Sequence, residues 1–259
     1  MHLKLISSNI RYENPHDGIH SWENRRPILQ EIITNYHPDI LATQEGREVQ
    51  IKSLAELLQL KLVESHREWI TERMYPCLYV NEEQITVKRS GDIWLSETPL
   101  TPGSISFKST FPRLCTWMHV THLVNNQDYF VVNTHLDHIF EETRLKQINV
   151  LITEVGKLNQ DNLPLILMGD FNDTPTSNVR KSIVNSLDLK DPWLEEGHTE
   201  ETSHHGFKEA TEGPESGERI DWILIPHAFA VEEIYLEKNN FNGIFPSDHY
   251  PLLATVIPR

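Results

Sequence analysis

The chain has 259 residues, 38% of them hydrophobic, and its 38 acidic and 23 basic side chains leave a net charge of −15. That length suits one large domain or two small ones, and the longest apolar runs fall far short of the roughly 20 residues of a membrane-spanning helix, so we expect no membrane span. Because nonspecific binding to duplex DNA comes mainly from Lys and Arg, the acidic balance predicts that strong nonspecific duplex DNA binding is absent.

The N-terminus and the cysteines favour a cytoplasmic location. The chain runs from Met1 directly into a strand pattern and lacks the apolar core and cleavage site of a secretory signal. Cys77 and Cys115 lie in apolar segments without metal-ligand spacing, so we expect two buried free thiols and no disulfide.

The first third of the chain alternates predicted strands and helices. The apolar periodicity predicts strands over 3–10 and 39–44, and helices over 22–36 and 49–60. Pro27 falls early enough in the first helix to be tolerated. Such alternation predicts a sheet covered by helices.

The remainder of the chain favours strands, interrupted by two helices. It shows no repeat and no composition break, so we expect a single domain over 1–259. The predicted elements are short strands with turns over 62–87, a strand over 91–95, a turn-rich loop over 97–104, antiparallel strands over 114–123 and 128–136 joined by the turn 125–127, a helix over 140–158, a strand over 163–168, a helix over 177–187, a polar loop over 195–219, and strands over 220–225 and 252–257.

The segment GDFND carries the sharpest polar signal. Gly169 follows an apolar strand pattern, and its missing side chain lets the backbone crowd a ligand. Asp170 and Asn172 stand two apart, so on an extended chain they point to the same side. A carboxylate and a carboxamide there could hold an attacking water beside a metal, although Asp and Asn are also common in strand-end turns.

Two further oxygen donors end predicted strands. Glu45 is a hard donor of the kind Mg²⁺ prefers, and an exposed loop glutamate is the plain alternative. Asn9 could contact a metal or a phosphate, or it could hydrogen-bond a turn.

His135 could donate a hydrogen bond to developing negative charge, or it could be a satisfied core histidine. Asp137 and His138 are possible orienting groups.

Asp248 and His249 are neighbours before the last strand, so their side chains point apart and serve separate tasks. His249 therefore needs an orienting acid from elsewhere, and Asp221 is the natural candidate because a charged residue inside a strand needs a partner. Such a His–Asp couple could act as acid or base or stabilise charge. The alternative for Asp221 is an ion pair with Arg219 or Lys190.

Arg144 and a group of histidines are weaker candidates. Arg144 sits near a helix start and could reach a phosphate, or it could pair with Glu141 or Glu142 on the helix surface. The histidines of the polar loop have no clear metal spacing, which favours a solvated loop; they are His198, His204 and His205.

Six motifs in one order, SSNIRY, PDILATQE, NTHLDH, GDFND, RIDWI and SDHYP, resemble the endonuclease/exonuclease/phosphatase (DNase I-like) superfamily. The match extends from Asn9 to Pro251. The resemblance implies an α/β fold, a four-layer α/β/β/α sandwich with two mixed sheets face to face. It also implies a Mg²⁺ or Mn²⁺ site at Glu45, supported by Asn9 and Asp248.

The resemblance also implies catalytic roles. Asp170 and Asn172 would orient the water and the phosphate, while His249, oriented by Asp221, and His135 would stabilise the pentacovalent phosphoryl group. Asn9 and Arg144 would contact the substrate, the latter with Gln147 as a phosphate-side pair. The phrases WENRR and WLSETPLTPGS look like a bacterial subgroup of mostly unassigned substrate, from which this chain departs at Thr71-Glu72-Arg73, where a Gly-Glu pair is common.

We therefore expect a metal-dependent phosphoester hydrolase, a phosphodiesterase or phosphatase, that acts on a small or single-stranded substrate as a monomer. A DNA endonuclease or exonuclease of the abasic-site type is the alternative, but it would need basic loops beside the cleft, and 97–104 and 195–219 offer few bases. A non-catalytic binding module would have lost Glu45, Asp170 or His249, and none is lost.

Overall fold

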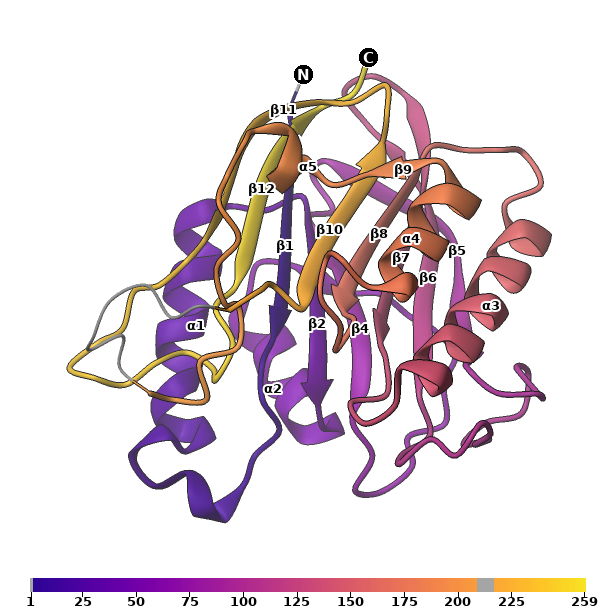
Figure 1. Cartoon of the computed structure of the whole chain (residues 1–259). Coiled ribbons are helices and arrows are strands. Elements are labelled where there is room, and N and C mark those ends of the chain that lie inside the picture. The colour runs from indigo at the N-terminus through magenta and orange to yellow at the C-terminus, as the bar shows by residue number, and fades with distance from the viewer. Residues whose placement is uncertain (1, 209–216) are drawn as a thin grey trace.

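Two six-stranded mixed sheets lie face to face in the computed structural model, which describes residues 2–208 and 217–259 (Figure 1). The part of the predicted polar loop at 209–216 lies outside the described residues. The first sheet has the order β11 (Ala230–Leu236), β12 (Leu252–Ile257), β1 (Leu3–Asn9), β2 (Ile40–Gly46), β4 (Tyr75–Val80), β3 (Lys61–Leu62). The second has the order β5 (Ile85–Trp94), β6 (Leu114–His122), β7 (Gln127–His135), β8 (Leu165–Asp170), β10 (Asp221–Pro226), β9 (Leu189–Lys190).

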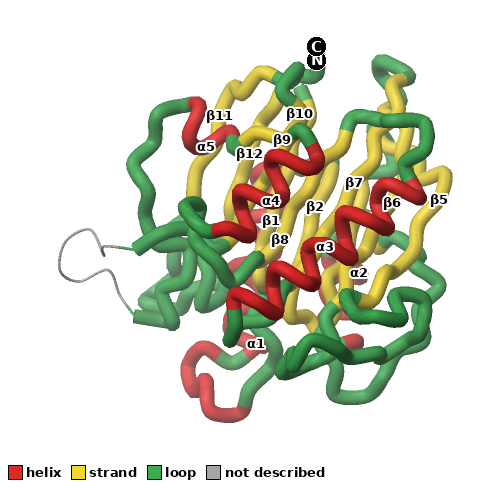
Figure 2. Tube along the Cα trace, turned by 45° about the vertical axis from the view of Figure 1, so that its right-hand side comes forward, coloured by secondary structure: helices red, strands yellow, loops and turns green. Residues whose placement is uncertain are grey.

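Helices cover both outer faces. On the first sheet, α1 (Trp22–Tyr36) and α2 (Glu48–Leu57) share an apolar cluster with outward residues of β1, β2 and β4. On the second, α3 (Glu141–Leu158) and α4 (Asn178–Leu187) pack on β6, β7, β8 and β10, as Figure 2 shows. Two short helices, η1 (Pro15–His20) and α5 (Pro192–Glu195), lie in connections. The predicted four-layer sandwich is confirmed.

Alternation along β1 decides which side chains enter the space between the sheets. Leu3 and Leu5 join the core between the sheets, whereas Ile6 joins the outer cluster under α1 and α2. Because successive side chains of a strand point to opposite faces, the next inward positions are Ser7 and Asn9, both buried. The inner face of β1 therefore turns from apolar to polar at its C-terminal end.

Four more strands make the same change at the same end of the sandwich. The register places His135 of β7 and Asp221 of β10 on either side of Asp170 in β8. The inward positions run from Ile40 and Ala42 to Gln44 in β2, from Val131 to Asn133 and His135 in β7, from Ile166 and Met168 to Asp170 in β8, and from Ile225 and Ile223 back to Asp221 in β10.

Glu45 departs from this alternation. The register of β2 against β4 shifts between Thr43 and Gly46, and Glu45 has a left-handed backbone with φ of 64°. A bulge re-aims a side chain relative to the regular strand. Here it turns Glu45 into a cavity at the polar end of the sheets.

Most predicted elements match, and the exceptions have local causes. The segments 62–87 and 91–95 resolve into β3, β4 and one long β5, which continues through a register shift between Val87 and Arg89. The second helix ends at Leu57, because Leu58 is already extended. The edge strand β11 was not predicted, since its two central positions are Glu232 and Glu233. Both cysteines are buried and unpaired, as predicted, and no helix in the described ranges is long and apolar enough to cross a membrane.

Gly169, the single glycine of β8, should be hard to replace. Its φ is 149°, and a Cβ would lie 2.2 Å from the carbonyl oxygen of Thr134 in β7. The missing side chain of Gly169 therefore allows the close approach of a neighbouring strand, and not of a ligand as predicted. We expect Gly169→Ala to lower the free energy of unfolding by roughly 1–3 kcal/mol, the range for overpacked cores, measured by urea denaturation.

Gly156 of α3 provides the matched control. A Cβ there meets nothing within 4 Å, so Gly156→Ala should raise the free energy of unfolding by about 0.5–1 kcal/mol through helix propensity. Equal effects of the two substitutions would contradict the close approach of β7 and β8.

Candidate active site

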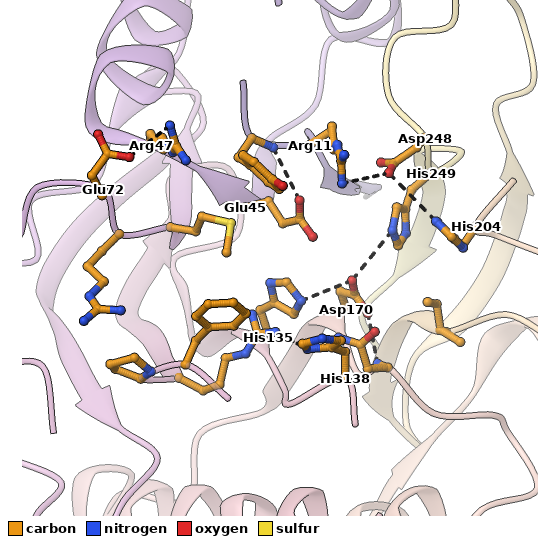
Figure 3. Close-up of a pocket in the computed structure, with 18 residues that line it drawn as sticks. Arg11, Glu45, Arg47, Glu72, His135, His138, Asp170, His204, Asp248 and His249 are labelled. Carbon is orange, nitrogen blue, oxygen red and sulfur yellow. Dashed lines mark hydrogen bonds and ion pairs between the residues drawn. The ribbon is translucent and has the colours of Figure 1, made fainter. Parts of the chain in front are cut away.

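The polar ends of the inner-face strands border one cavity of about 550 Å³ (Figure 3). Asn9 and Asp221 lie directly behind its wall, each at most 1% exposed. Six of the predicted residues line it: Glu45, His135, Asp170, Asn172, Asp248 and His249. Segments far apart in the chain thus place their polar side chains in one site.

His249 and Asp221 form a buried pair. Asp221 Oδ2 lies 2.8 Å from Nδ1 of His249 and also accepts a hydrogen bond of 2.7 Å from Oγ of Ser203. The alternative partner Arg219 instead pairs with Asp191 and Glu200. Asp221 therefore fixes the imidazole ring and leaves Nε2 directed at the cavity.

The charges around His249 make it a cation. Burial alone lowers the pKa of His249, but the carboxylates of Asp221, Asp170 and Asp248 outweigh it and raise that pKa to about 10. Burial together with Asp221 raises the pKa of Asp170. A protonated imidazole thus stands beside a carboxyl group that accepts protons more readily than an ordinary aspartate.

Asp170 is the hub of the contacts across the cavity floor. Its Oδ2 accepts a hydrogen bond of 2.9 Å from Nδ2 of Asn9 and lies 3.4 Å from Nε2 of His135. Burial and the nearby charge of Arg113 hold the pKa of His135 well below its usual range, so that ring is neutral. A neutral imidazole keeps one N–H to donate to an anionic ligand.

Asn172 reaches the cavity by a route other than the predicted one. Its φ is 50°, so the chain turns sharply after Asp170 instead of staying extended. The backbone N–H of Asn172 donates to Oδ1 of Asp170, and its Nδ2 donates to the carbonyl of Leu136. The turn, which the sequence offered only as the alternative, is what places Asn172 beside Asp170.

Three groups of side chains in the described residues could hold a divalent cation. Carboxylate oxygens of Glu45 and Asp170 and a ring nitrogen of His135 lie within 4.8 Å of one another. The same holds for ligand atoms of His204, Asp248 and His249, and for those of Asp170, Asp221 and His249. Within the described residues, Oε2 of Glu45 accepts one hydrogen bond, of 3.3 Å from the N–H of Tyr12, which leaves lone pairs for an ion. Of the predicted set, Glu45 and Asp248 fall in different groups and Asn9 falls in none. Oδ1 of Asn9 accepts from the N–H of Arg11.

Arg144 is not among the residues that line the cavity, so the structure does not bring it to the site as predicted. Its Nε donates to Asp173 at 2.8 Å and its Nη1 to the carbonyl of Asp137. Asp137 itself is fully buried and accepts from the N–H groups of Thr110, Ile139 and Phe140. Asp137 therefore anchors the loop before β6 and the start of α3, and Arg144 joins that helix to the segment after β8.

His204 corrects the prediction of a solvated loop. Its Nε2 lies 3.8 Å from Oδ2 of Asp248, and its ring lies 4.7 Å from that of His249. His205 is buried against Tyr250. Their sequence context gave no signal, because the contacts are made only when the polar loop folds back along the segment before β12.

The sequence reading also missed the arginines of the cavity. Arg47 pairs with Glu72 at 3.3 Å on the rim, which gives the altered segment at 71–73 a place in the site. Of these arginines, Arg11 alone lies in a motif that predicted the site, SSNIRY. The four arginines that line the cavity are Arg11, Arg47, Arg73 and Arg113.

Residues 6–249 match the sequence pattern of the endonuclease/exonuclease/phosphatase family. The chain belongs to this family. Solved structures agree: a mannosyl-6-phosphatase of Bacteroides thetaiotaomicron is 25% identical with a TM-score of 0.88, covering 98% of this chain and 99% of that one. A protein of unknown function from Enterococcus faecalis is 26% identical with a TM-score of 0.87, covering 99% and 100%.

A curated family relative, Nocturnin of Xenopus laevis, is 26% identical over 267 aligned positions, which cover 90% of this chain. The match spans 64% of that protein's length. The family assignment rests on the sequence pattern matched over residues 6–249.

The charge of His249 provides a test of the site. In protein freed of divalent cations by EDTA, we expect the ring of His249 to stay protonated up to about pH 10, because Asp221 binds the imidazolium. Asp221→Asn should lower this pKa by more than about one unit, as expected for the loss of a neighbouring opposite charge. NMR titration of the ring resonances measures both values.

The raised pKa of His249 also sets how the contribution of this pair to folding stability depends on pH. The pair stabilises the folded state fully below the unfolded pKa of about 6.5, and this contribution is lost as pH rises through about 10.

Asp161→Asn, at an exposed acid outside the cavity, is the control for the NMR titration and should leave the pKa of His249 unchanged. An unchanged titration in Asp221→Asn would contradict the pairing.

Proposed function

We propose that this protein is a divalent-metal-dependent hydrolase of phosphoester bonds that acts on small or single-stranded substrates. The observation that carries the proposal is the cavity where Asp170, the Asp221–His249 pair and Glu45 converge with arginines. Phosphoester hydrolysis requires acidic side chains that bind a cation and transfer protons, and hydrogen-bond donors that contact the phosphate oxygens. The cavity brings both kinds of side chain together. The family and the mannosyl-6-phosphatase relative support the same class of reaction.

The group of Glu45, His135 and Asp170 fits a hard cation such as Mg²⁺ or Mn²⁺, because two of its three ligand atoms are carboxylate oxygens. Glu45 would hold the ion, with Asn9 and Asp248 as further oxygen donors, and the ion would neutralise charge on the phosphoryl and leaving oxygens. The bulge at Glu45 supports this role, since a strained backbone at a non-glycine residue is commonly retained for a ligand.

We assign the proton transfer and the stabilisation of negative charge to different side chains. Asp170, with its raised pKa, would accept a proton from the attacking water while Asn172 helps to orient that water. The water oxygen bonds to phosphorus as the ester P–O bond breaks, and the leaving oxygen takes up a proton to become an alcohol. The imidazolium of His249 and the neutral ring of His135 would donate to the phosphoryl oxygens as negative charge grows there.

The size and charge of the molecule support a small substrate. The cavity volume of about 550 Å³ falls within the ~300–1,000 Å³ of small-molecule sites. Its arginines lie inside the cavity and on its rim, while the whole chain carries a charge of −15. A duplex would meet net repulsion beyond the site, so we expect intact duplex DNA to be cut far more slowly than small esters.

Loss of a central side chain should abolish turnover without unfolding the protein. With Mn²⁺ or Mg²⁺ and nitrophenyl esters of phosphate, we expect Asp170→Asn, Asp248→Ala and His249→Ala each to lower kcat by roughly 10²–10⁴-fold, the range for removal of general acid–base groups. Circular dichroism checks the fold, and Glu83→Gln, at an exposed turn outside the cavity, should keep the wild-type rate.

The metal requirement is tested in the same assay. EDTA should stop hydrolysis, and added Mn²⁺ or Mg²⁺ should restore it. Rates that persist in EDTA, or near-wild-type rates in the three variants, would overturn the proposed function.

A further inference from the structure

Arg113 differs from the other arginines buried in the described residues. It is 7% exposed, yet its only polar side-chain contact there joins Nη2 to Nδ1 of His138 at 3.4 Å, and its Nε is buried without a partner. The other buried guanidinium groups each bind a carboxylate or several carbonyls: Arg67 binds Asp92, Arg144 binds Asp173, Arg180 and Arg219 bind Asp191, and Arg25 binds four backbone carbonyls.

An unpaired buried cation is costly, so buried charges are almost always paired. Arg113 faces the same cavity as Glu45, His135 and Asp170. The carboxylates of Glu45 and Asp170 act on its charge but form no ion pair with it. An anion bound in the cavity would supply the missing partner.

The surroundings hold Arg113 in place. The preceding loop is fixed by Asp137, which accepts from Oγ of Ser109 and the N–H of Thr110. The carbonyl of Arg113 accepts from the N–H of Leu95. Its guanidinium lies 5.7 Å from the ring centre of Phe111, which stacks on His138. The group is thus pre-positioned before any ligand binds.

The number of charges on the ligand decides what Arg113 recognises. A phosphate monoester carries about −1.5 to −2 charges at pH 7, whereas a diester carries one and has a second carbon-bearing oxygen. A fixed cation with a planar fork matches the terminal oxygens of a phosphate that carries two charges.

We propose, on the basis of the proposed function, that Arg113 binds two non-bridging oxygens of a terminal, doubly charged phosphate, and that the substrates are phosphate monoesters of small hydroxyl compounds. Water then supplies the oxygen that bonds to phosphorus, the ester P–O bond breaks, and the products are inorganic phosphate and an alcohol that carries one of the water protons.

Paired esters with one leaving group test the proposal. With nitrophenyl phosphate and bis-nitrophenyl phosphate in Mn²⁺, the wild type should prefer the monoester. Arg113→Met should lower kcat/KM for the monoester by about 100-fold, the scale for loss of one transition-state donor, and should affect the diester only a few-fold. Arg113→Lys, which keeps the charge and loses the fork, should fall between. Equal losses on both esters, or none, would overturn the proposal.

A binding measurement keeps the test independent of turnover. Inorganic phosphate should raise the Tm of the wild type and not that of Arg113→Met, which should itself fold at least as stably because it removes an unpaired charge. Equal protection of both proteins by phosphate would also overturn the proposal. Arg89→Met, an exposed site on β5 outside the cavity, is the control for loss of one charge and should behave as wild type in both measurements.

The two proposals fail in different ways. If the wild type hydrolyses neither ester with any divalent cation, the proposed function is wrong, whatever the phosphate protection shows. If it hydrolyses both and the ratio of their rates is unchanged in Arg113→Met, only the assignment of Arg113 is wrong.

Discussion

The rest of the structure depends on hydrogen bonds that join the two sheets at their polar end. Buried polar groups must be paired, and here each sheet supplies the partners for the other. Gln44 of β2 donates to Asn133 of β7 at 2.8 Å, and Asn9 of β1 donates to Asp170 of β8 at 2.9 Å. A shift of one residue in any of these strands would turn the polar side chain to the outer face. The register that satisfies these bonds is therefore the register that assembles the site.

Buried ion pairs away from the cavity extend this control to the loops. Asp191 accepts from both Arg180 and Arg219, and Arg219 also binds Glu200. These contacts hold the segment that contains Ser203, whose hydroxyl binds Asp221. The orientation of the His249 ring thus depends on a chain of buried contacts that leads back to α4 and β9, because each partner would be left unpaired if the loop moved.

Charge balance explains why basic groups are gathered in so acidic a molecule. Glu45, Asp170 and Asp248 face one cavity. Carboxyl groups that lie close together do not all ionise easily, because their negative charges repel one another. Arg11 offsets Asp248 at 3.5 Å, and His249 takes a proton. Burial together with Asp221 raises the pKa of Asp170, and the carboxylates of Asp221, Asp170 and Asp248 keep His249 protonated. The site is thus set to receive a cation and an anion together.

The sequence by itself determined the strand ends and most of the polar residues there, because strand periodicity is written in neighbouring residues. The layers were implied by the resemblance that the six motifs carry. Asn9, Asp170 and Asp221 follow from counting along apolar runs. Only the tertiary structure decided that Arg113 faces the cavity without an ion pair to any described residue, and that His204 folds onto Asp248. It also paired Arg144 with Asp173, outside the lining of the cavity. The physical reason is that an arginine or histidine in a loop has many possible partners within reach, and long-range packing alone selects among them.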